Sequence, residues 1–201
     1  MQTVMSTLQN SVKYAKSAYT DSKNIISSHY GCQVRVDITQ EYCVVSFRGS
    51  EQILDWLCNL LASRASFHGT NVHRGFLIQY NSVRSELLEV IKNKRNILCC
   101  GHSLGGALAA LCAIDLWSLG FDITLITIGA PRVGDAAFNR KLSRIQSYHI
   151  QNKLDPVTYM PPCFHRMAPS IFVKSRHLLV NHHSLNVYDQ ALSHMKSGFR
   201  W

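Results

Sequence analysis

NILCCGHSLGGALAALCAIDLW, residues 96–117, is the stretch that decides the fold. An apolar run ends at Gly101, His102 and Ser103 follow, and two glycines lead into an alanine-rich segment. This is the pattern G-x-S-x-G between an apolar strand and a helix, the context in which the pattern forms a sharp turn that exposes a nucleophilic serine. Glycine is needed on both sides because side chains there would collide with the strand and the helix. The stretch therefore predicts Ser103 as a nucleophile.

The rest of the chain predicts an α/β fold around this stretch. Apolar, strand-like runs lie at 33–38, 42–47, 96–100, 123–128 and 147–150, and helical periodicity lies at 4–28, 76–92, 104–119, 135–146 and 184–196. Strands that are apolar throughout and alternate with helices indicate a mostly parallel central sheet with helices on both faces. Reactive groups gather at the carboxyl ends of the strands in such sheets, and Ser103 lies just beyond one.

Length and composition favour one domain over residues 1–201, with an amino-terminal helix within 1–29. The chain has 201 residues, 46% of them hydrophobic, which is enough for one full core. We expect no transmembrane segment and no secretory signal, because the apolar runs are too short and the first residues lack a continuous apolar block. The seven cysteines are irregularly spaced and mostly within apolar stretches, which fits buried thiols and an intracellular location.

The charge of the chain is basic and unevenly placed. The net charge is +9, and residues 121–201 contribute +6 of it. Such a field favours an anionic partner, either a phospholipid surface or nucleic acid, although it also serves solubility. A nucleic-acid partner is not expected, because no helix-turn-helix, zinc knuckle or RNP-like strand accompanies the charge. A metal site is not expected either, because the histidines and the cysteine between 163 and 183 follow no common zinc spacing.

A serine nucleophile needs a histidine that takes its proton and an acid that orients the histidine. In α/β-hydrolases these follow the serine in the order acid, then histidine. Asp155 follows the last predicted strand in a loop fixed by prolines, whereas Asp189 falls inside the last predicted helix. Two adjacent histidines stand just before that helix, His182 and His183, and the spacing alone leaves both open as the base. Weaker candidates are His165, His177 and His194.

Six segments in a fixed order resemble the motifs of the class 3 lipases, the fungal-lipase-like α/β-hydrolases. They are VVSFRGSEQILDWLCNL (44–60), VHRGF (72–76), GHSLGGALAAL (101–111), GAPRVGDAAF (129–138), NKLDPVTYMPP (152–162) and HSLNVYDQAL (183–192). The resemblance covers about residues 30–195. It implies a serine esterase that releases fatty acid from glycerolipids, as a triacylglycerol lipase or a phospholipase A1, and that needs no metal or organic cofactor.

The same resemblance implies the catalytic residues. They are Ser103 as nucleophile, Asp155 as acid and His183 as base. His183 is preferred to His182 because Tyr188 lies five residues after it, in the family pattern H-x-x-x-x-Y.

The resemblance also implies an oxyanion hole and a lid. Ser50 and Leu104 match the residues whose backbone N–H groups hold the oxyanion, and a turn or helix cap is the plainer interpretation of Ser50. Residues 51–61 match the lid, which implies that Ile53, Trp56 and Leu57 contact substrate or a lipid surface. A helical apolar stripe of this kind is more often a core face.

The resemblance further implies a lipid ester substrate and transient contact with a lipid or membrane surface. The alternative is a hydrolase fold that has lost catalysis and serves as a scaffold for lipid or anionic partners. All triad and oxyanion positions are filled, which disfavours that alternative. The chain is shorter than secreted members of the family, so the sequence does not select one lipid ester.

Overall fold

The computed structural model describes residues 2–20, 24–39, 42–50, 63–174 and 181–195. Within them the main sheet has the strand order β1-β2-β3-β6-β7-β8-β9. These strands are β1 (Ile25–Ser27), β2 (Gln33–Ile38), β3 (Cys43–Phe47), β6 (Asn96–His102), β7 (Asp122–Ile128), β8 (Gln146–Asn152) and β9 (Ser170–Val173). Strands β1, β2 and β3 pair antiparallel, and every pair from β3 to β9 is parallel. The predicted mostly parallel sheet is confirmed.

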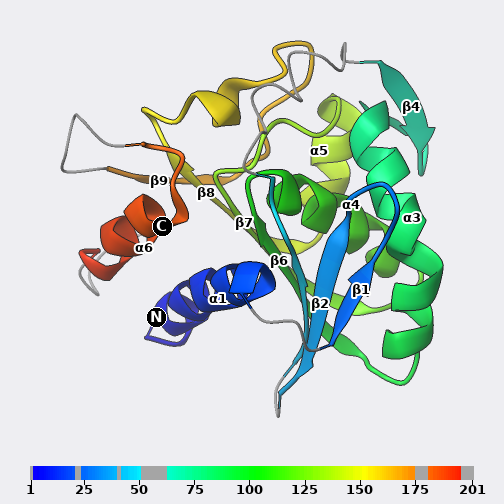
Figure 1. The fold of residues 1–201 in the computed structure, drawn as a ribbon. Helices are drawn as coiled ribbons and strands as arrows, with labels where there is room; N and C mark the ends of the chain where they lie inside the picture. Colours follow the sequence, from blue (N-terminus) through cyan, green and yellow to red (C-terminus); the bar gives the residue numbers. More distant parts are fainter. Residues whose placement is uncertain (1, 21–23, 40–41, 51–62, 175–180, 196–201) are drawn as a thin grey trace.

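Helices cover both faces of this sheet (Figure 1). One face carries α1 (Gln2–Thr20) and α6 (Leu185–Ser193), and the other carries α3 (Arg74–Ile91), α4 (Leu104–Ser118) and α5 (Ala136–Leu142). Each face has its own cluster of buried apolar side chains, because strands β3, β6 and β7 point alternate residues to opposite sides. Helix α4 is buried from Leu104 to Leu116, so it is the central helix of the domain.

Small residues bring α4 close to the sheet. A Cβ atom on Gly106 would lie 2.8 Å from Cβ of Ala130 and 3.0 Å from the carbonyl oxygen of Gly101. Larger side chains would push the helix away, and the turn that precedes it would move with it. The alanine-rich sequence thus fixes the helix that carries the nucleophile.

The predicted amino-terminal helix is too long. The helix ends at Thr20, Asn24 has a φ of 57°, and the segment after it forms β1, in which Ile25 pairs with Arg35 of β2. The β-branched pair Ile25-Ile26 favours a strand over a helix end. The helices predicted at 135–146 and 184–196 are also shorter: they span Ala136–Leu142 and Leu185–Ser193, and Asp135 and Ser184 cap their first turns from outside.

Four further elements were not predicted. Strands β4 (Arg64–Phe67) and β5 (Thr70–His73) form a separate hairpin, β9 extends the main sheet, and η1 (Pro156–Tyr159) is a 3₁₀ turn after β8. In the described part of the chain, no helix has an apolar stretch long enough to cross a membrane. The predicted lid, 51–61, lies outside the described residues.

Candidate active site

Ser103 lies in the turn between β6 and α4, as predicted. Its φ of 59° and ψ of −129° are unusual for a residue with a side chain, and its backbone N–H donates to the carbonyl oxygen of Ile128 at 2.9 Å. Such strain persists only where the surroundings enforce it, and it is characteristic of functional turns. The turn holds the serine side chain at the carboxyl end of the parallel strands.

The glycines on either side of this serine are required sterically. A Cβ atom on Gly105 would overlap the carbonyl oxygen of Phe47, and one on Gly101 would overlap the backbone of Gly105. Phe47 and Gly101 are register partners in β3 and β6. The collision that the sequence predicted between flanking side chains and their neighbours is therefore present at both positions.

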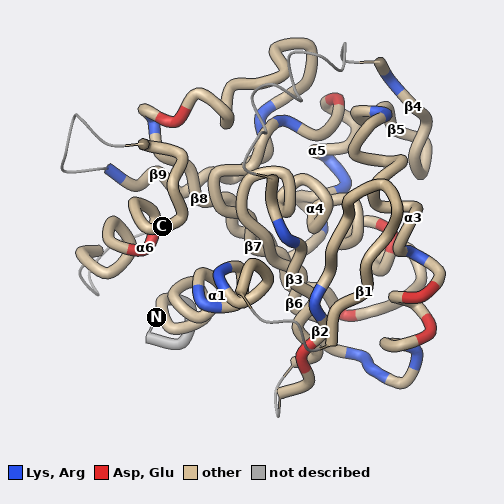
Figure 2. Tube along the Cα trace, in the orientation of Figure 1, with Lys and Arg blue, Asp and Glu red and all other residues tan. Residues whose placement is uncertain are grey.

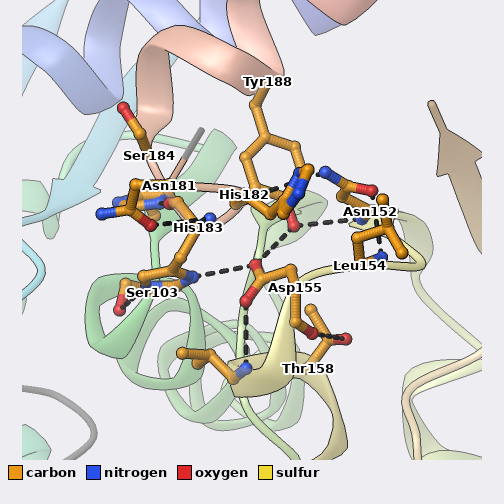
Figure 3. Close-up of polar contacts among 12 residues, drawn as sticks. Ser103, Asn152, Leu154, Asp155, Thr158, Asn181, His182, His183, Ser184 and Tyr188 are labelled. Atoms are coloured by element: carbon orange, nitrogen blue, oxygen red, sulfur yellow. Dashed lines mark hydrogen bonds and ion pairs between the residues drawn. The ribbon is translucent and has the colours of Figure 1, made fainter. Parts of the chain in front are cut away.

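Ser103, His183 and Asp155 form one chain of hydrogen bonds (Figure 3). Nε2 of His183 lies 2.7 Å from Oγ of Ser103, and Nδ1 of His183 lies 2.8 Å from Oδ2 of Asp155. Asp155 follows β8 and caps η1, whereas His183 precedes α6. Three segments far apart in the sequence thus meet in the geometry of a nucleophile, a base and an orienting acid.

The Asp155 carboxylate is fully buried and its two oxygens have separate partners. Oδ1 accepts the backbone N–H of Val157 at 3.0 Å, and Oδ2 accepts the hydroxyl of Tyr188 at 2.7 Å in addition to His183. Burial, and then the neighbouring carboxylate, raise the pKa of Tyr188 far above its usual value, so the hydroxyl keeps its proton and donates it. The same hydroxyl oxygen accepts the backbone N–H of Asn152 at 3.0 Å. The sequence analysis used Tyr188 only for its spacing from His183 and did not predict its contact with Asp155.

The structure brings His183, not His182, to the serine. The carbonyl oxygen of His182 accepts the side-chain amide of Asn152 at 3.4 Å, and its Nδ1 has no hydrogen-bond partner among the described residues. The weaker candidates are elsewhere: His165 pairs with Gly134 and His194 ends α6, while residue 177 lies outside the described ranges.

The two predicted oxyanion residues belong to two separate segments next to the nucleophile. Leu104 is the first residue of α4, where backbone N–H groups have no partner within the helix. Ser50 follows β3, and a Cβ atom on the preceding Gly49 would lie 3.3 Å from Cβ of Ser103. Ser50 and His183 also line a common pocket of about 490 Å³. The remaining lining residues are Lys16, Tyr19, Thr20, His102, Asn181, Ser184, Leu185 and Asn186.

The other predicted site residues, Ile53, Trp56 and Leu57, fall in the segment that the structure does not describe. Sequence reasoning missed Tyr19 and His102, which line the pocket beside the triad. Across the described residues, no three histidine, cysteine, aspartate or glutamate side chains are grouped so that they could hold a metal ion.

This chain is similar to known lipases and phospholipases. The profile of the family described as Lipase (class 3) matches residues 44–165. A lipase of Rhizomucor miehei is 36% identical over 134 residues, which covers 59% of this chain and 37% of the lipase. A phospholipase A1 of Oryza sativa subsp. indica, EG1, is 29% identical over 157 residues, which covers 60% of this chain and 36% of that protein.

A solved triacylglycerol lipase, whose catalytic centre is described as a serine protease triad, has a similar fold. Its TM-score is 0.72 at 26% identity, over 86% of this chain and 80% of the solved one. The chain spans less than half the length of the two relatives it matches in sequence. The family profile nevertheless matches more than half of the chain, and the fold is that of the solved lipase. The chain belongs to the class 3 lipase family and has the α/β-hydrolase fold.

Proposed function

We propose that this protein is a serine carboxylic ester hydrolase that releases fatty acid from glycerolipids, as a triacylglycerol lipase or a phospholipase A1. The observation that carries the proposal is the continuous hydrogen-bond chain from Ser103 through His183 to Asp155, with contacts of 2.7 and 2.8 Å. The names of the relatives, a lipase and a phospholipase A1, support the class of substrate.

The first half of the reaction acylates Ser103. Oγ attacks the carbonyl carbon of the ester while Nε2 of His183 takes the hydroxyl proton, and Asp155 stabilises the resulting imidazolium. The carbonyl oxygen becomes an oxyanion. When the tetrahedral intermediate collapses, the bond to the alcohol breaks and His183 returns the proton to the leaving oxygen. The products are an acyl-enzyme and a free alcohol.

The oxyanion is held by backbone N–H groups, in this proposal those of Leu104 and Ser50. Leu104 begins α4, so the positive end of the helix dipole also faces the developing charge. One well-placed donor of this kind lowers the barrier by about 3 kcal/mol. In the second half, His183 deprotonates a water molecule that attacks the acyl-enzyme, and the fatty acid leaves as the proton returns to Ser103.

We further propose that the protein contacts an anionic lipid surface through residues on both sides of the triad acid in the sequence. We call these residues the docking surface: Lys153, Leu154, Tyr159, Arg166 and Phe172. Leu154, Tyr159 and Phe172 are 49%, 38% and 39% exposed, and the Arg166 guanidinium lies 4.9 Å from the ring centre of Tyr159 and 5.5 Å from that of Phe172. Residues 153–174 contain one acidic residue, Asp155 (Figure 2). Its carboxylate is buried and hydrogen-bonded to His183. Apolar side chains surrounded by cations suit an anionic bilayer.

The predicted lid remains part of the proposal. If Ile53, Trp56 and Leu57 contact lipid, Trp56→Ala lowers activity on an emulsion and leaves the hydrolysis of a dissolved short-chain ester unchanged. An equal loss on both substrates would assign this stripe to the core instead.

We also propose that the protein works in a reducing, intracellular compartment. Of the cysteines in the described ranges, five are buried free thiols and Cys163 is exposed. Burial raises the pKa of the Cys32 and Cys100 thiols to about 12, so they stay protonated and unreactive. To test this, the protein is isolated from its own cells, unfolded without any reductant and treated with an alkylating reagent. All seven cysteines should react.

Fatty-acid release from a mixed emulsion of triacylglycerol and phospholipid tests the function. Wild type should release fatty acid, Ser103→Ala should release none, and Ser193→Ala should behave as wild type because Ser193 is an exposed serine at the end of α6. The lipid consumed distinguishes a lipase from a phospholipase A1. A folded wild type that releases no fatty acid from either lipid would refute the proposal.

A further inference from the structure

The last turn of the amino-terminal helix reaches the active site. Tyr19, next to the end of α1, lies against His102, the residue before the nucleophile, with its hydroxyl 3.3 Å from Nδ1 of His102. Helix α1 lies outside residues 44–165, the part of the chain that the family profile matches. The contact therefore joins a helix outside the matched part of the chain to the nucleophile turn.

His102 is bonded to the backbone of the triad histidine. Its Nε2 lies 2.7 Å from the carbonyl oxygen of His183, and the two rings lie 4.8 Å apart at an interplanar angle of 31°. A carbonyl oxygen can only accept, so Nε2 of His102 carries a proton and donates it. A neutral imidazole that donates at Nε2 has Nδ1 as its acceptor. That acceptor is the atom that faces Tyr19.

Tyr19 completes the arrangement. A hydroxyl next to an accepting Nδ1 donates its proton, so the Tyr19 hydroxyl favours the tautomer of His102 that bonds His183. The segment that ends at Ser50, residues 48–50, is called the oxyanion segment. Its backbone leaves room for the Tyr19 hydroxyl, because a Cβ atom on Gly49 would overlap that hydroxyl and would lie 2.6 Å from the carbonyl oxygen of His102. The guanidinium of Arg48 lies 5.5 Å from the centre of the Tyr19 ring. Tyr19 is thus held between the oxyanion segment and the nucleophile turn.

We propose that His102 and Tyr19 are positioning residues of the hydrolysis: His102 holds the backbone of His183 by donating to its carbonyl oxygen, and Tyr19 fixes the tautomer in which it does so. The proposal rests on the proposed function. Its physical reason is that the imidazole of His183 must stay within reach of both Ser103 and Asp155 while it gains and loses a proton. A loop residue keeps such a position when its backbone is also bonded.

The neighbour of His183 must also be uncharged. Two imidazolium rings 4.8 Å apart would repel, which would oppose protonation of His183 by Ser103. Burial, and then the charge of His183, lower the pKa of His102 to about 4, so His102 stays neutral when His183 takes the proton of Ser103. His102 can therefore donate a hydrogen bond without adding a cation to the site.

Kinetics on a dissolved ester, p-nitrophenyl butyrate, test the positioning role. His102→Leu removes the donor and should lower kcat about 10- to 100-fold with little change in KM, because the loss acts after substrate binding. His102→Gln should recover most of kcat, since its amide nitrogen can donate from about the place of Nε2. Tyr19→Phe should lower kcat by up to about tenfold. The matched control is Tyr14→Phe. Tyr14 lies on the same helix and packs against the apolar cluster between this helix and the sheet, so this variant should keep the wild-type kcat.

The imidazole ¹⁵N shifts of His102 give a readout that needs no activity. They should report the Nε2–H tautomer in wild type and a mixture of tautomers in Tyr19→Phe. A wild-type kcat in folded His102→Leu, or an Nδ1–H tautomer in wild type, overturns the positioning role and leaves the proposed function intact. A wild type with the expected tautomer that hydrolyses no ester refutes the proposed function, and the positioning role with it.

Discussion

The hydroxyl of Tyr188 donates to Oδ2 of Asp155 at 2.7 Å, the same oxygen that faces Nδ1 of His183. Tyr188 lies in the first turn of α6 and is fully buried. The residue that supports the acid therefore lies on the helix that directly follows the base, His183. Tyr188→Phe keeps the ring and removes the hydroxyl. We expect kcat to fall about tenfold, equivalent to one lost hydrogen bond, with KM unchanged.

Steady-state kinetics of Tyr188→Phe beside Tyr30→Phe, a change at an exposed tyrosine, check this expectation. A parallel drop in the thermal midpoint is also expected, because the backbone N–H of Asn152 loses its acceptor. Unchanged kcat in a folded Tyr188→Phe would show that Asp155 needs no support from α6.

The second prediction concerns the nucleophile turn. Gly105→Ala places a methyl group on the carbonyl oxygen of Phe47, so the turn and β3 must separate. We expect the free energy of unfolding to fall by about 3 kcal/mol or more, and activity to disappear because Ser103 moves. Gly69→Ala is the control, since nothing lies within 4 Å of its Cβ position and only its φ of 70° resists the change, at about 1 kcal/mol. Urea unfolding measures both, and equal losses would contradict the steric account.

The third prediction concerns a buried ionic cluster on the other face of the sheet. Asp115 of α4 is 1% exposed and accepts hydrogen bonds from Tyr80, Arg84 and His68 at 2.6, 2.6 and 2.9 Å. Burial raises the pKa of Asp115, but these donors outweigh burial and the pKa lies below its usual value. The carboxylate is therefore charged, and it joins α3, α4 and the β4–β5 hairpin.

Asp115→Asn should cost about 2 kcal/mol of stability, less than a fully buried pair because Arg84 is 35% exposed, and should leave kcat unchanged at 25 °C. The control is Asp122→Asn, whose pair with Arg95 is exposed and contributes at most about 0.5 kcal/mol. Equal effects on the free energy of unfolding would mean that burial adds nothing to the Asp115 cluster.

The fourth prediction is a loss of stability in acid. Burial lowers the pKa of His149 to about 4, and burial with the charge of His183 lowers that of His102 to about 4, against 6.5 in an exposed histidine. Between these values the unfolded chain binds protons that the folded chain does not. The free energy of unfolding should therefore fall by about 3 kcal/mol for each histidine as the pH drops from 6.5 to 4.

His149→Gln removes the contribution of His149 to the acid loss of stability and leaves that of His102. Glutamine stays neutral at every pH and can still bond Thr127, the 2.9 Å partner of His149. Urea unfolding at several pH values should show a shallower acid slope in this variant than in wild type. A wild-type stability that is flat from pH 7 to pH 4 would show that these histidines protonate in the folded state.

Local sequence rules predicted the part of the site that local geometry builds. The strand, the glycines and the helix around Ser103 occupy consecutive residues, and each constrains the next by sterics. Asp155 could also be predicted, because it lies in a proline-fixed loop after a strand, a suitable place for the triad acid. The choice of His183 over His182 needed the family pattern, since both histidines stand in one loop and only the register of that loop separates them.

Contacts between distant segments could not be predicted in this way. Tyr19 and His102 are 83 residues apart, and no periodicity connects them. The β4–β5 hairpin has one local signal in the sequence, Gly69. Its two turn residues, His68 and Gly69, have φ values of 48° and 70°, and a tight two-residue hairpin requires positive φ values, which glycine favours. The flanking strands are four residues each, too short and too polar for period-two alternation to stand out.

The most direct test of the central claim is intact-protein mass spectrometry after reaction with a fluorophosphonate, which labels activated serines. We predict one adduct on Ser103 in wild type, none in Ser103→Ala, a label at least 100-fold slower in His183→Ala, and a wild-type rate in His182→Ala. An adduct on another residue, or labelling of His183→Ala at the wild-type rate, would contradict the account that Ser103 and His183 act together as nucleophile and base.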